Sequence, residues 1–230
     1  MVATASPKEI PEPSPPEIAD EPESLDALDR GEDYLEVRVD AVDLSGVDAS
    51  HAHLTRSEFI GTTLTAATLR AVTLVDVRFR DCELSGADLH DASLHRVEFR
   101  NCRMTGVNFS EAELRHVRFV GCKLDDANLR FARLDHVRGD GCSMVEADAY
   151  EASLTAVRLE ATDLSRADLS KVVVTGLDLR GSTIEALRGA ANLHHIRIGA
   201  ALNIDEAHVE DVVRHAIAQT SDNSARPNRG

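Results

Sequence analysis

The chain has 230 residues, of which 43% are hydrophobic, and carries a formal net charge of −15. This charge argues against direct binding to nucleic acid, because phosphates attract basic surfaces. No apolar run reaches the length of a membrane span, and the N-terminus lacks the basic start and apolar run of a signal peptide. We therefore expect a cytoplasmic protein with no membrane partner, whose cysteines are reduced thiols.

Residues 1–36 are acidic and rich in proline. They carry 11 acidic and two basic side chains, so this short segment accounts for most of the net charge. Few large apolar side chains occur in it, and a segment that can bury little apolar surface does not recover the entropy lost on ordering. The composition predicts a disordered N-terminal segment over residues 1–36.

Residues 37–189 form an internal repeat with a period of five. Every fifth residue from Val39 to Ile184 is large and apolar, with three exceptions, and the residue two positions earlier is always apolar or small. This period fits neither the roughly 3.6 residues of a helical turn nor the alternation of a strand. Two residues of each pentad are therefore expected to face inward and three outward.

Like residues recur at every twentieth position of this repeat. The two clearest series are the cysteines Cys82, Cys102, Cys122 and Cys142 and the phenylalanines Phe59, Phe79, Phe99 and Phe119. Twenty residues are four pentads, so a four-sided coil would stack like residues directly over one another. The pattern predicts an all-β solenoid, a quadrilateral parallel β-helix, with both series as structural core ladders.

Two features of the expected core need a specific interpretation. We expect the cysteines to act as small apolar residues, interchangeable with the alanine and valine found at the same position of other pentads. The small residues Gly139 and Ala149 leave gaps at opposing central positions of one coil. We expect the flexible side chain of Met144 to fill them; the alternative is a void that weakens the core locally.

The five-residue pattern ends at Gly189, and residues 190–219 follow a helical pattern instead. Asp205 is suited to be an N-cap, and one apolar stripe follows it, formed by Val209, Val212, Val213 and Ile217. The pattern predicts a small C-terminal α-helical cap. Residues 220–230 are expected to be a flexible tail.

No arrangement of residues in the sequence is typical of a catalytic, metal or cofactor site. The ten histidines lack a third acidic or thiol ligand at suitable spacing, and no phosphate-binding loop or nucleophile motif occurs. His116 and His136 are instead expected to stack one coil apart. We predict a protein that is not an enzyme and has no catalytic residue, metal, cofactor or small-molecule substrate.

The outward charges differ between the four expected sides. One side is net basic and contains Arg78, Arg80, Arg96, Arg100, Arg118, Arg138 and Arg158. Another is net acidic and contains Asp88, Asp126, Glu146, Asp148 and Asp168. The acidic side is the candidate partner-binding surface, although such charges are also typical of a face that only contacts solvent.

The repeat resembles the pentapeptide repeat proteins. The motifs Ala87-Asp88-Leu89, Ala127-Asn128-Leu129 and Ala167-Asp168-Leu169 match the A(D/N)LXX unit of that family. The resemblance implies that the β-helix is right-handed. From Leu179 through the helix near Asp205 to Ala218, the chain is also similar to the mycobacterial fluoroquinolone-resistance members of the family, in which a short helical module joins two copies. The resemblance implies that residues 190–219 are a dimerisation module, with Val209, Val212, Val213 and Ile217 as its contact residues; the alternative is that the helix only caps the solenoid.

The resemblance implies a homodimeric rod whose acidic surface imitates duplex DNA and binds DNA gyrase. Such a protein would protect gyrase from quinolones without contacting nucleic acid itself. A basic groove that gains affinity from phosphates would accept carboxylates at comparable spacing. The alternative is a scaffold for protein–protein interaction that does not act on a topoisomerase.

Overall fold

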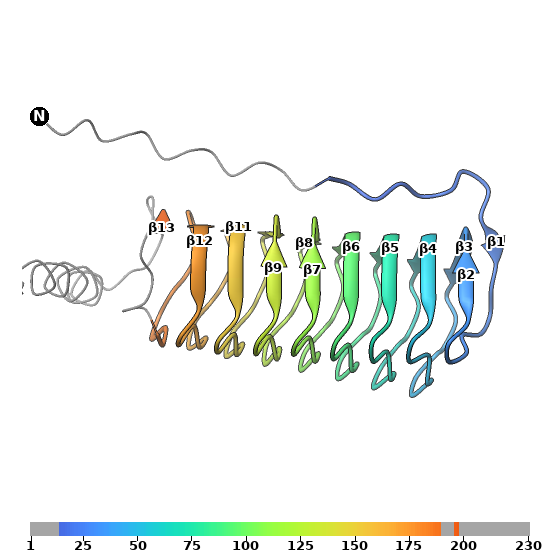
Figure 1. Ribbon diagram of the computed structural model, residues 1–230, viewed down its shortest axis with the longest axis horizontal. Coiled ribbons are helices and arrows are strands. Elements are labelled where there is room, and N and C mark those ends of the chain that lie inside the picture. The colour runs from blue at the N-terminus through green and yellow to red at the C-terminus, as the bar shows by residue number, and fades with distance from the viewer. Residues whose placement is uncertain (1–13, 190–195, 198–230) are drawn as a thin grey trace, which may run out of the picture.

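The described part of the chain is a stack of short parallel strands wound into one rod (Figure 1). The computed structural model describes residues 14–189 and 196–197. It has no helix within those ranges, and all thirteen strands belong to one sheet. The strands are β1 (Glu23–Ser24), β2 (Asp33–Leu35), β3 (Val37–Asp40), β4 (His53–Ile60), β5 (Thr73–Arg80), β6 (Ser93–Arg100), β7 (Glu113–Arg115), β8 (Arg118–Val120), β9 (Arg133–Asp135), β10 (Arg138–Asp140), β11 (Ser153–Glu160), β12 (Val173–Asp178) and β13 (Ile196–Arg197).

The strands of successive coils pair in a constant register of twenty residues. In β5 and β6, Thr73 pairs with Ser93 and Arg80 with Arg100. Single parallel bridges continue the same register on the other two sides, for example between Thr63 and Glu83. The frame runs without interruption to residue 188. These pairings confirm the predicted all-β parallel solenoid, which has about seven turns.

A corner follows each pentad, because one residue in five adopts the left-handed backbone conformation. In one coil these residues are Asp76, Asp81, Gly86 and Asp91, with φ angles of 57°, 54°, 67° and 58°. Glycine, asparagine and aspartate tolerate this conformation best, whereas most other residues are disfavoured there. Four such corners in every twenty residues give the coil its four sides.

The interior consists of side chains stacked in columns along the rod axis. Phe59, Phe79, Phe99 and Phe119 lie one above another, with ring centroids 4.7, 4.9 and 5.2 Å apart and the planes within 17° of parallel. Leucine columns surround them, and Leu84, Leu89 and Leu114 are fully buried. Each such leucine contributes roughly 1.5–3 kcal/mol, so these columns supply most of the stability.

The cysteine column is buried and bonds one coil to the next. All four cysteines are free thiols. The thiols of Cys102, Cys122 and Cys142 donate to the carbonyl oxygens of residues 79, 99 and 119 in the preceding coil, at 3.6, 3.3 and 3.5 Å. In the same column Thr62 donates to the carbonyl of Val39 at 3.1 Å and Ser182 to that of Leu159 at 2.7 Å. The column therefore favours small hydrogen-bond donors, a preference that packing as an apolar residue does not explain.

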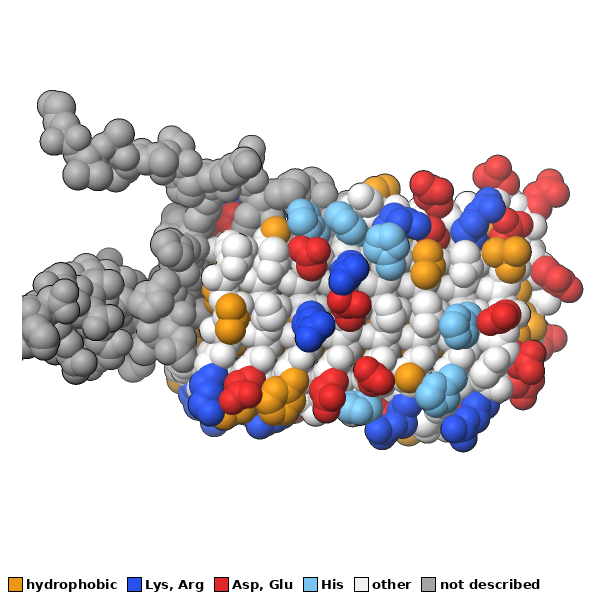
Figure 2. All heavy atoms as spheres, viewed as in Figure 1, with side chains coloured by type: hydrophobic (Ala, Val, Ile, Leu, Met, Phe, Trp, Pro, Cys, Tyr) orange, Lys and Arg blue, Asp and Glu red, His pale blue; other side chains and the backbone are white. Residues whose placement is uncertain are grey.

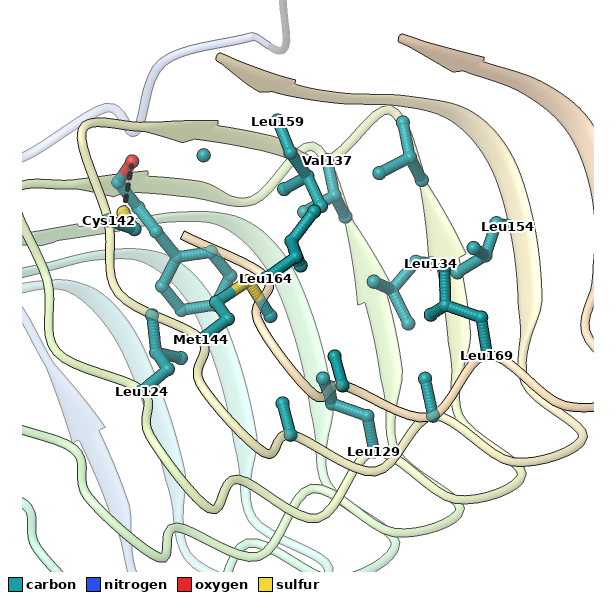
Figure 3. A pocket seen from close by; sticks show the side chains of 16 residues that line it. Leu124, Leu129, Leu134, Val137, Cys142, Met144, Leu154, Leu159, Leu164 and Leu169 are labelled. Carbon is teal, nitrogen blue, oxygen red and sulfur yellow. Dashed lines mark hydrogen bonds between the residues drawn. The ribbon is translucent and has the colours of Figure 1, made fainter. Parts of the chain in front are cut away.

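One apolar cavity interrupts the core of the described residues where the central side chains are small (Figure 3). It measures about 40 Å³ and lies among Gly139, Ala149 and the surrounding leucines. Leu159 leans into the space beside Gly139, since a Cβ added there would lie 2.8 Å from its Cδ2 atom. Met144 is only partly buried. The prediction that Met144 fills both gaps is therefore wrong.

The disordered segment predicted for residues 1–36 is wrong for its second part, because residues 14–36 pack against the solenoid. β1 pairs with β3, and Leu28 is buried to 3% exposure over the first coil, so residues 23–36 cover that end of the rod. Residues 14–22, here called the strap, precede this cover in the chain. They run along the rod over later coils before the chain reaches the first coil (Figure 1). Buried apolar side chains and hydrogen-bonded backbone offset the entropy of ordering this segment.

The other end of the described solenoid departs from the frame. β13 pairs in parallel with β12, but Ile196 lies opposite Leu177, one residue short of the regular register. The predicted helical cap over residues 190–219 and the tail over residues 220–230 lie outside the described residues, apart from β13. Among the residues that the structure describes, no helix is long and apolar enough to cross a membrane.

Candidate partner-binding surface

The structure places the five predicted acidic residues on one side of the rod. Asp88, Asp148 and Asp168 lie in a single column, in which bridges connect each coil to the next. Asp126 and Glu146 occupy the adjoining corner, with φ angles of 57° and 59°. We call this surface, which comprises residues 86–90, 106–110, 126–130, 146–150 and 166–170, the acidic side.

The column carboxylates of the acidic side also stabilise local turns. Asp88, Asp148 and Asp168 each accept a hydrogen bond from the backbone N–H two residues later, at 3.1, 2.9 and 2.8 Å. Such turns explain why the repeat favours Asp or Asn before its central leucine. Burial opposes the ionisation of Asp168, but the hydrogen bonds from Ser170 prevail and keep the pKa of its carboxyl below the ordinary value.

Arginines from neighbouring coils pair with four of the five acidic residues. Four ion pairs cross the coils: Arg70–Asp88 at 3.1 Å, Arg130–Asp148 at 2.8 Å, Arg166–Glu146 at 2.7 Å and Arg188–Asp168 at 3.6 Å. Asp126 has no such pair within the described residues. All four pairs are partly exposed, where an ion pair contributes only about 0–1 kcal/mol. A cationic partner could therefore replace the arginines at little cost.

The side predicted to be basic is a network in which arginines pair with acidic residues of the same side. It is formed by outward residues of β3–β6, β8 and β10–β12. Arg78 lies between Glu58 and Glu98, at 3.7 and 3.5 Å. Both glutamate side chains are less than 10% exposed. The carboxylate of Asp178 is fully buried and accepts hydrogen bonds from Arg180, which outweigh its burial and keep its pKa low. These arginines hold adjacent coils together and are poor candidates for an anion site.

Charges of both signs also alternate elsewhere on the surface (Figure 2). Lys, Arg, Asp and Glu side chains are intermixed along both long edges of the visible face, while acidic side chains gather at the end formed by β1–β3. Residues 37–189 carry 24 acidic and 19 basic side chains. The rod therefore has many carboxylates but a small net charge.

The strap covers a corner that contains histidines and a buried ion pair. Arg96 holds Asp76 through two hydrogen bonds of 2.6 Å, and the backbone N–H of Glu17 donates to the same carboxylate at 3.0 Å. Asp76 is 6% exposed, and although burial opposes its ionisation, these bonds keep its pKa below the ordinary value. The backbone N–H of Ser14 donates to Nδ1 of His116 at 3.3 Å.

The histidines of this corner stack but are not arranged around a metal. The rings of His116 and His136 are stacked with centroids 4.9 Å apart, and His95 lies 5.9 Å from His116. Burial, followed by the charge of Arg96, lowers the pKa of His95. Burial likewise lowers the pKa of His116. No cluster suited to a metal ion occurs in the described ranges of the chain.

Two of the four buried thiols, Cys102 and Cys142, are poor nucleophiles in this setting. Contact with the neighbouring thiol of Cys122, together with burial, raises the pKa of Cys102 and of Cys142. A thiol that stays protonated and buried neither attacks an electrophile nor binds a metal readily. The cysteine and phenylalanine series are therefore structural in this fold.

Sequence reasoning missed one partly exposed aromatic cluster at the edge of the acidic side. Phe131 and Tyr150 meet edge to face at 6.1 Å, and the guanidinium of Arg130 lies 4.4 Å from the centre of the Tyr150 ring. The available signal was that Phe131 alone among the six phenylalanines falls outside the two inward positions of its pentad. The predicted dimerisation residues Val209, Val212, Val213 and Ile217 lie outside the described residues.

The fold defines a rod-shaped repeat protein whose backbone geometry recurs from coil to coil and whose outer faces carry charged side chains. The model of the pentapeptide repeat region matches residues 36–100 and 92–169. The chain belongs to the pentapeptide repeat family.

Solved structures of this family share the fold at low sequence identity. Two trypsin-treated forms of QnrB1, a plasmid-mediated fluoroquinolone resistance protein, are similar to this chain. One is 23% identical over 72% of this chain and 86% of QnrB1, with a TM-score of 0.53. The other is 20% identical over 83% and 91%, with a TM-score of 0.56. No curated protein matches the chain in sequence.

A third solved structure is of another pentapeptide repeat protein. HetL, from the cyanobacterium Nostoc sp., is a pentapeptide repeat protein involved in the regulation of heterocyst differentiation. It is 20% identical over 76% of this chain and 91% of its own, with a TM-score of 0.30. Likeness at this level of identity concerns the fold and not the partner.

Proposed function

We propose that this chain is a non-catalytic, rod-shaped binding protein whose acidic side occupies the DNA-binding surface of DNA gyrase or a related topoisomerase. The observation that carries the proposal is the constant register of that side, in which Asp88, Asp148 and Asp168 stand in one straight column, with Asn108 and Asn128 at the two coils between Asp88 and Asp148. Such a column presents negative charge along a straight axis, as a duplex does. Occupying the surface would block DNA and could protect the enzyme from quinolones.

Charge density indicates how strong the mimicry is. About seven turns at a strand separation of ~4.8 Å give a rod roughly 34 Å long. Its 24 carboxylates amount to one per about 1.4 Å, which is close to the one charge per about 1.7 Å of duplex DNA. The 19 basic residues offset most of this charge. The arginines must therefore turn away from the bound face, and the salt dependence of binding should be weaker than that of a duplex.

The ion pairs of the acidic side favour a second candidate function. Because Arg70, Arg130, Arg166 and Arg188 already neutralise four of the five carboxylates, the rod also suits a role as a protein–protein interaction scaffold with no topoisomerase partner. A scaffold would use its shape and individual side chains and would not compete with DNA. Competition with a duplex therefore separates the two functions.

The test uses the full chain, purified DNA gyrase and a fluorescently labelled duplex. We expect the protein to displace the duplex, inhibit supercoiling and reduce the DNA cleavage that a quinolone stabilises. Absence of both displacement and inhibition at a large molar excess over gyrase would leave the scaffold as the better proposal.

A matched pair of variants tests the acidic side itself. Asp126→Asn removes the one carboxylate of the five that has no ion pair, and Asp81→Asn removes a charge at a different corner. Both residues have the left-handed conformation, with φ of 57° and 54°, which asparagine tolerates. We expect only Asp126→Asn to weaken binding and to reduce its salt dependence. Equal effects of the two variants would show that general charge, and not this side, is recognised.

A further inference from the structure

Phe131 occupies a position at which the fold does not require an aromatic ring. It lies at an outward corner with 46% of its surface exposed, whereas the other five phenylalanines face the axis and are at most 6% exposed. Its φ angle is 61°, in the left-handed region. A bulky residue is a true outlier in that region, so the position is unfavourable for phenylalanine on two independent grounds.

The equivalent corners of other coils show what the fold itself prefers. One coil earlier the corner residue is Glu111, and one coil later it is Glu151, with φ angles of 60° and 57°. Further along the same corner are His51, Ala71, Asp91 and Lys171. Phe131 is the single large apolar side chain among all the left-handed positions that the structure describes. A residue that is disfavoured in its backbone conformation and does not stabilise the fold in return is typical of a functional position.

The side chains around Phe131 form a cluster in which aromatic rings, cations and a carboxylate contact one another. The guanidinium of Arg130 lies 4.4 Å from the centre of the Tyr150 ring and 5.5 Å from that of Phe131. Asp148 bonds this guanidinium at 2.8 Å and raises the pKa of Arg130 above its ordinary value. On the far side of Tyr150, the amine of Lys171 lies 4.8 Å from the ring centre. Tyrosine and arginine are enriched among the few residues that dominate binding at interfaces.

Carboxylates flank this cluster along the rod. Glu111 and Glu151 occupy the same corner one coil earlier and one coil later, and Glu151 lies 3.0 Å from the amine of Lys171. Asp126 and Glu146 occupy the other corner of the acidic side. An apolar centre flanked by carboxylates is complementary to an apolar pocket within a basic surface. A partner of that chemistry is a protein that ordinarily holds a duplex.

We propose that Phe131, supported by Tyr150 and Arg130, is the anchor that inserts into an apolar pocket on the basic DNA-binding surface of the topoisomerase, and that it selects this partner. The inference rests on the proposed function and deepens it. Carboxylates alone would attract any protein with a basic groove and would be screened by salt. Burial of a ring adds affinity that salt does not screen, and only a surface with a matching pocket gains from it.

The variant Phe131→Asn separates an anchor from a structural residue. Asparagine tolerates the left-handed conformation, so removal of the ring relieves strain, and we expect the melting temperature to stay the same or to rise. We expect affinity for gyrase to fall about thirtyfold, as at an interface hot spot. The slope of log affinity against log salt should be unchanged, whereas Asp126→Asn should reduce it. The matched control Ala71→Asn changes the same corner three coils earlier, where φ is 51°, without altering the charge, and should lose little affinity.

Each outcome decides between the proposals. If wild type binds gyrase and Phe131→Asn binds equally well, the anchor is refuted while the proposed function stands. A clear drop in the melting temperature of Phe131→Asn would show that the ring is structural and would also refute the anchor. If wild type does not bind gyrase at low salt, the proposed function and the anchor fall together.

Discussion

Replacing Ala149 by leucine tests whether the interior cavity is a packing defect. Ala149 lies between Leu129 and Leu169 in its column and lines the cavity of about 40 Å³. At about 24 cal/mol per Å³, this void costs about 1 kcal/mol. The three added carbons contribute up to about 2.4 kcal/mol at about 0.8 kcal/mol each. They exceed the available space, so strain of about 1–3 kcal/mol offsets part of this gain.

We therefore expect Ala149→Leu to stabilise the protein by about 1 kcal/mol, which corresponds to a rise in melting temperature of about 2–4 °C. Circular dichroism during heating and during urea unfolding measures this change. The control is Ala49→Leu, because Ala49 occupies the same column in the first coil, is fully buried and does not line the cavity. It should be destabilised by overpacking. If both variants lose stability to the same extent, the cavity cannot accept a side chain and the reasoning is wrong.

Three further predictions concern the axis and the strap. Leu114 is fully buried, so Leu114→Asp places a carboxylate on the dry axis and should abolish the cooperative thermal transition seen by circular dichroism; a normal transition would contradict the predicted core. Asp76→Asn weakens the bidentate bond from Arg96 and should make the strap more sensitive to limited proteolysis, with unchanged melting of the solenoid; equal cleavage rates would show that Asp76 does not hold the strap. Burial lowers the pKa of both His95 and His116 in the folded protein. Below about pH 6.5 the unfolded chain therefore binds more protons than the folded protein does, and the free energy of unfolding should fall as the pH drops further. Urea midpoints at neutral and mildly acidic pH measure this loss of stability, which should be smaller in the double variant His95→Asn, His116→Asn. If the double variant loses as much stability as the wild type, the loss comes from carboxylates and not from the two histidines.

The solenoid could be predicted from the sequence because a single rule recurs in every coil. The inward positions of Phe99 and Cys102 follow from counting by five and twenty, and each coil contacts only its neighbours. The hydrogen bonds of the cysteine column were missed because cysteine was considered only as an apolar residue. Thr62 and Ser182 in the same column were the available signal, since both carry a hydroxyl where an apolar residue would otherwise suffice.

The pairing of charges could be predicted only in part. Counting charges by side gave their signs but not which arginine reaches which carboxylate. In a coil of twenty residues, neighbours across coils are separated by about 18 to 22 positions, as in Arg70–Asp88 and Arg138–Glu160. That spacing was visible in the sequence. The order of residues 14–36 was not predictable in this way, because Ala19 and Leu28 follow no period and their contacts depend on the finished rod.

The direction of the strap constrains the order in which the protein can assemble during synthesis. Coils can be added one at a time as they leave the ribosome, because each needs only the coil before it. The contact of Ser14 with His116 spans 102 positions, so its binding site does not yet exist when the first coils are complete. The Ser14 end of the strap must therefore close late, over coils that have already formed. A chain that stops before residue 116 could still build coils and bind Glu17 to Asp76, but it would lack the contact of Ser14 with His116.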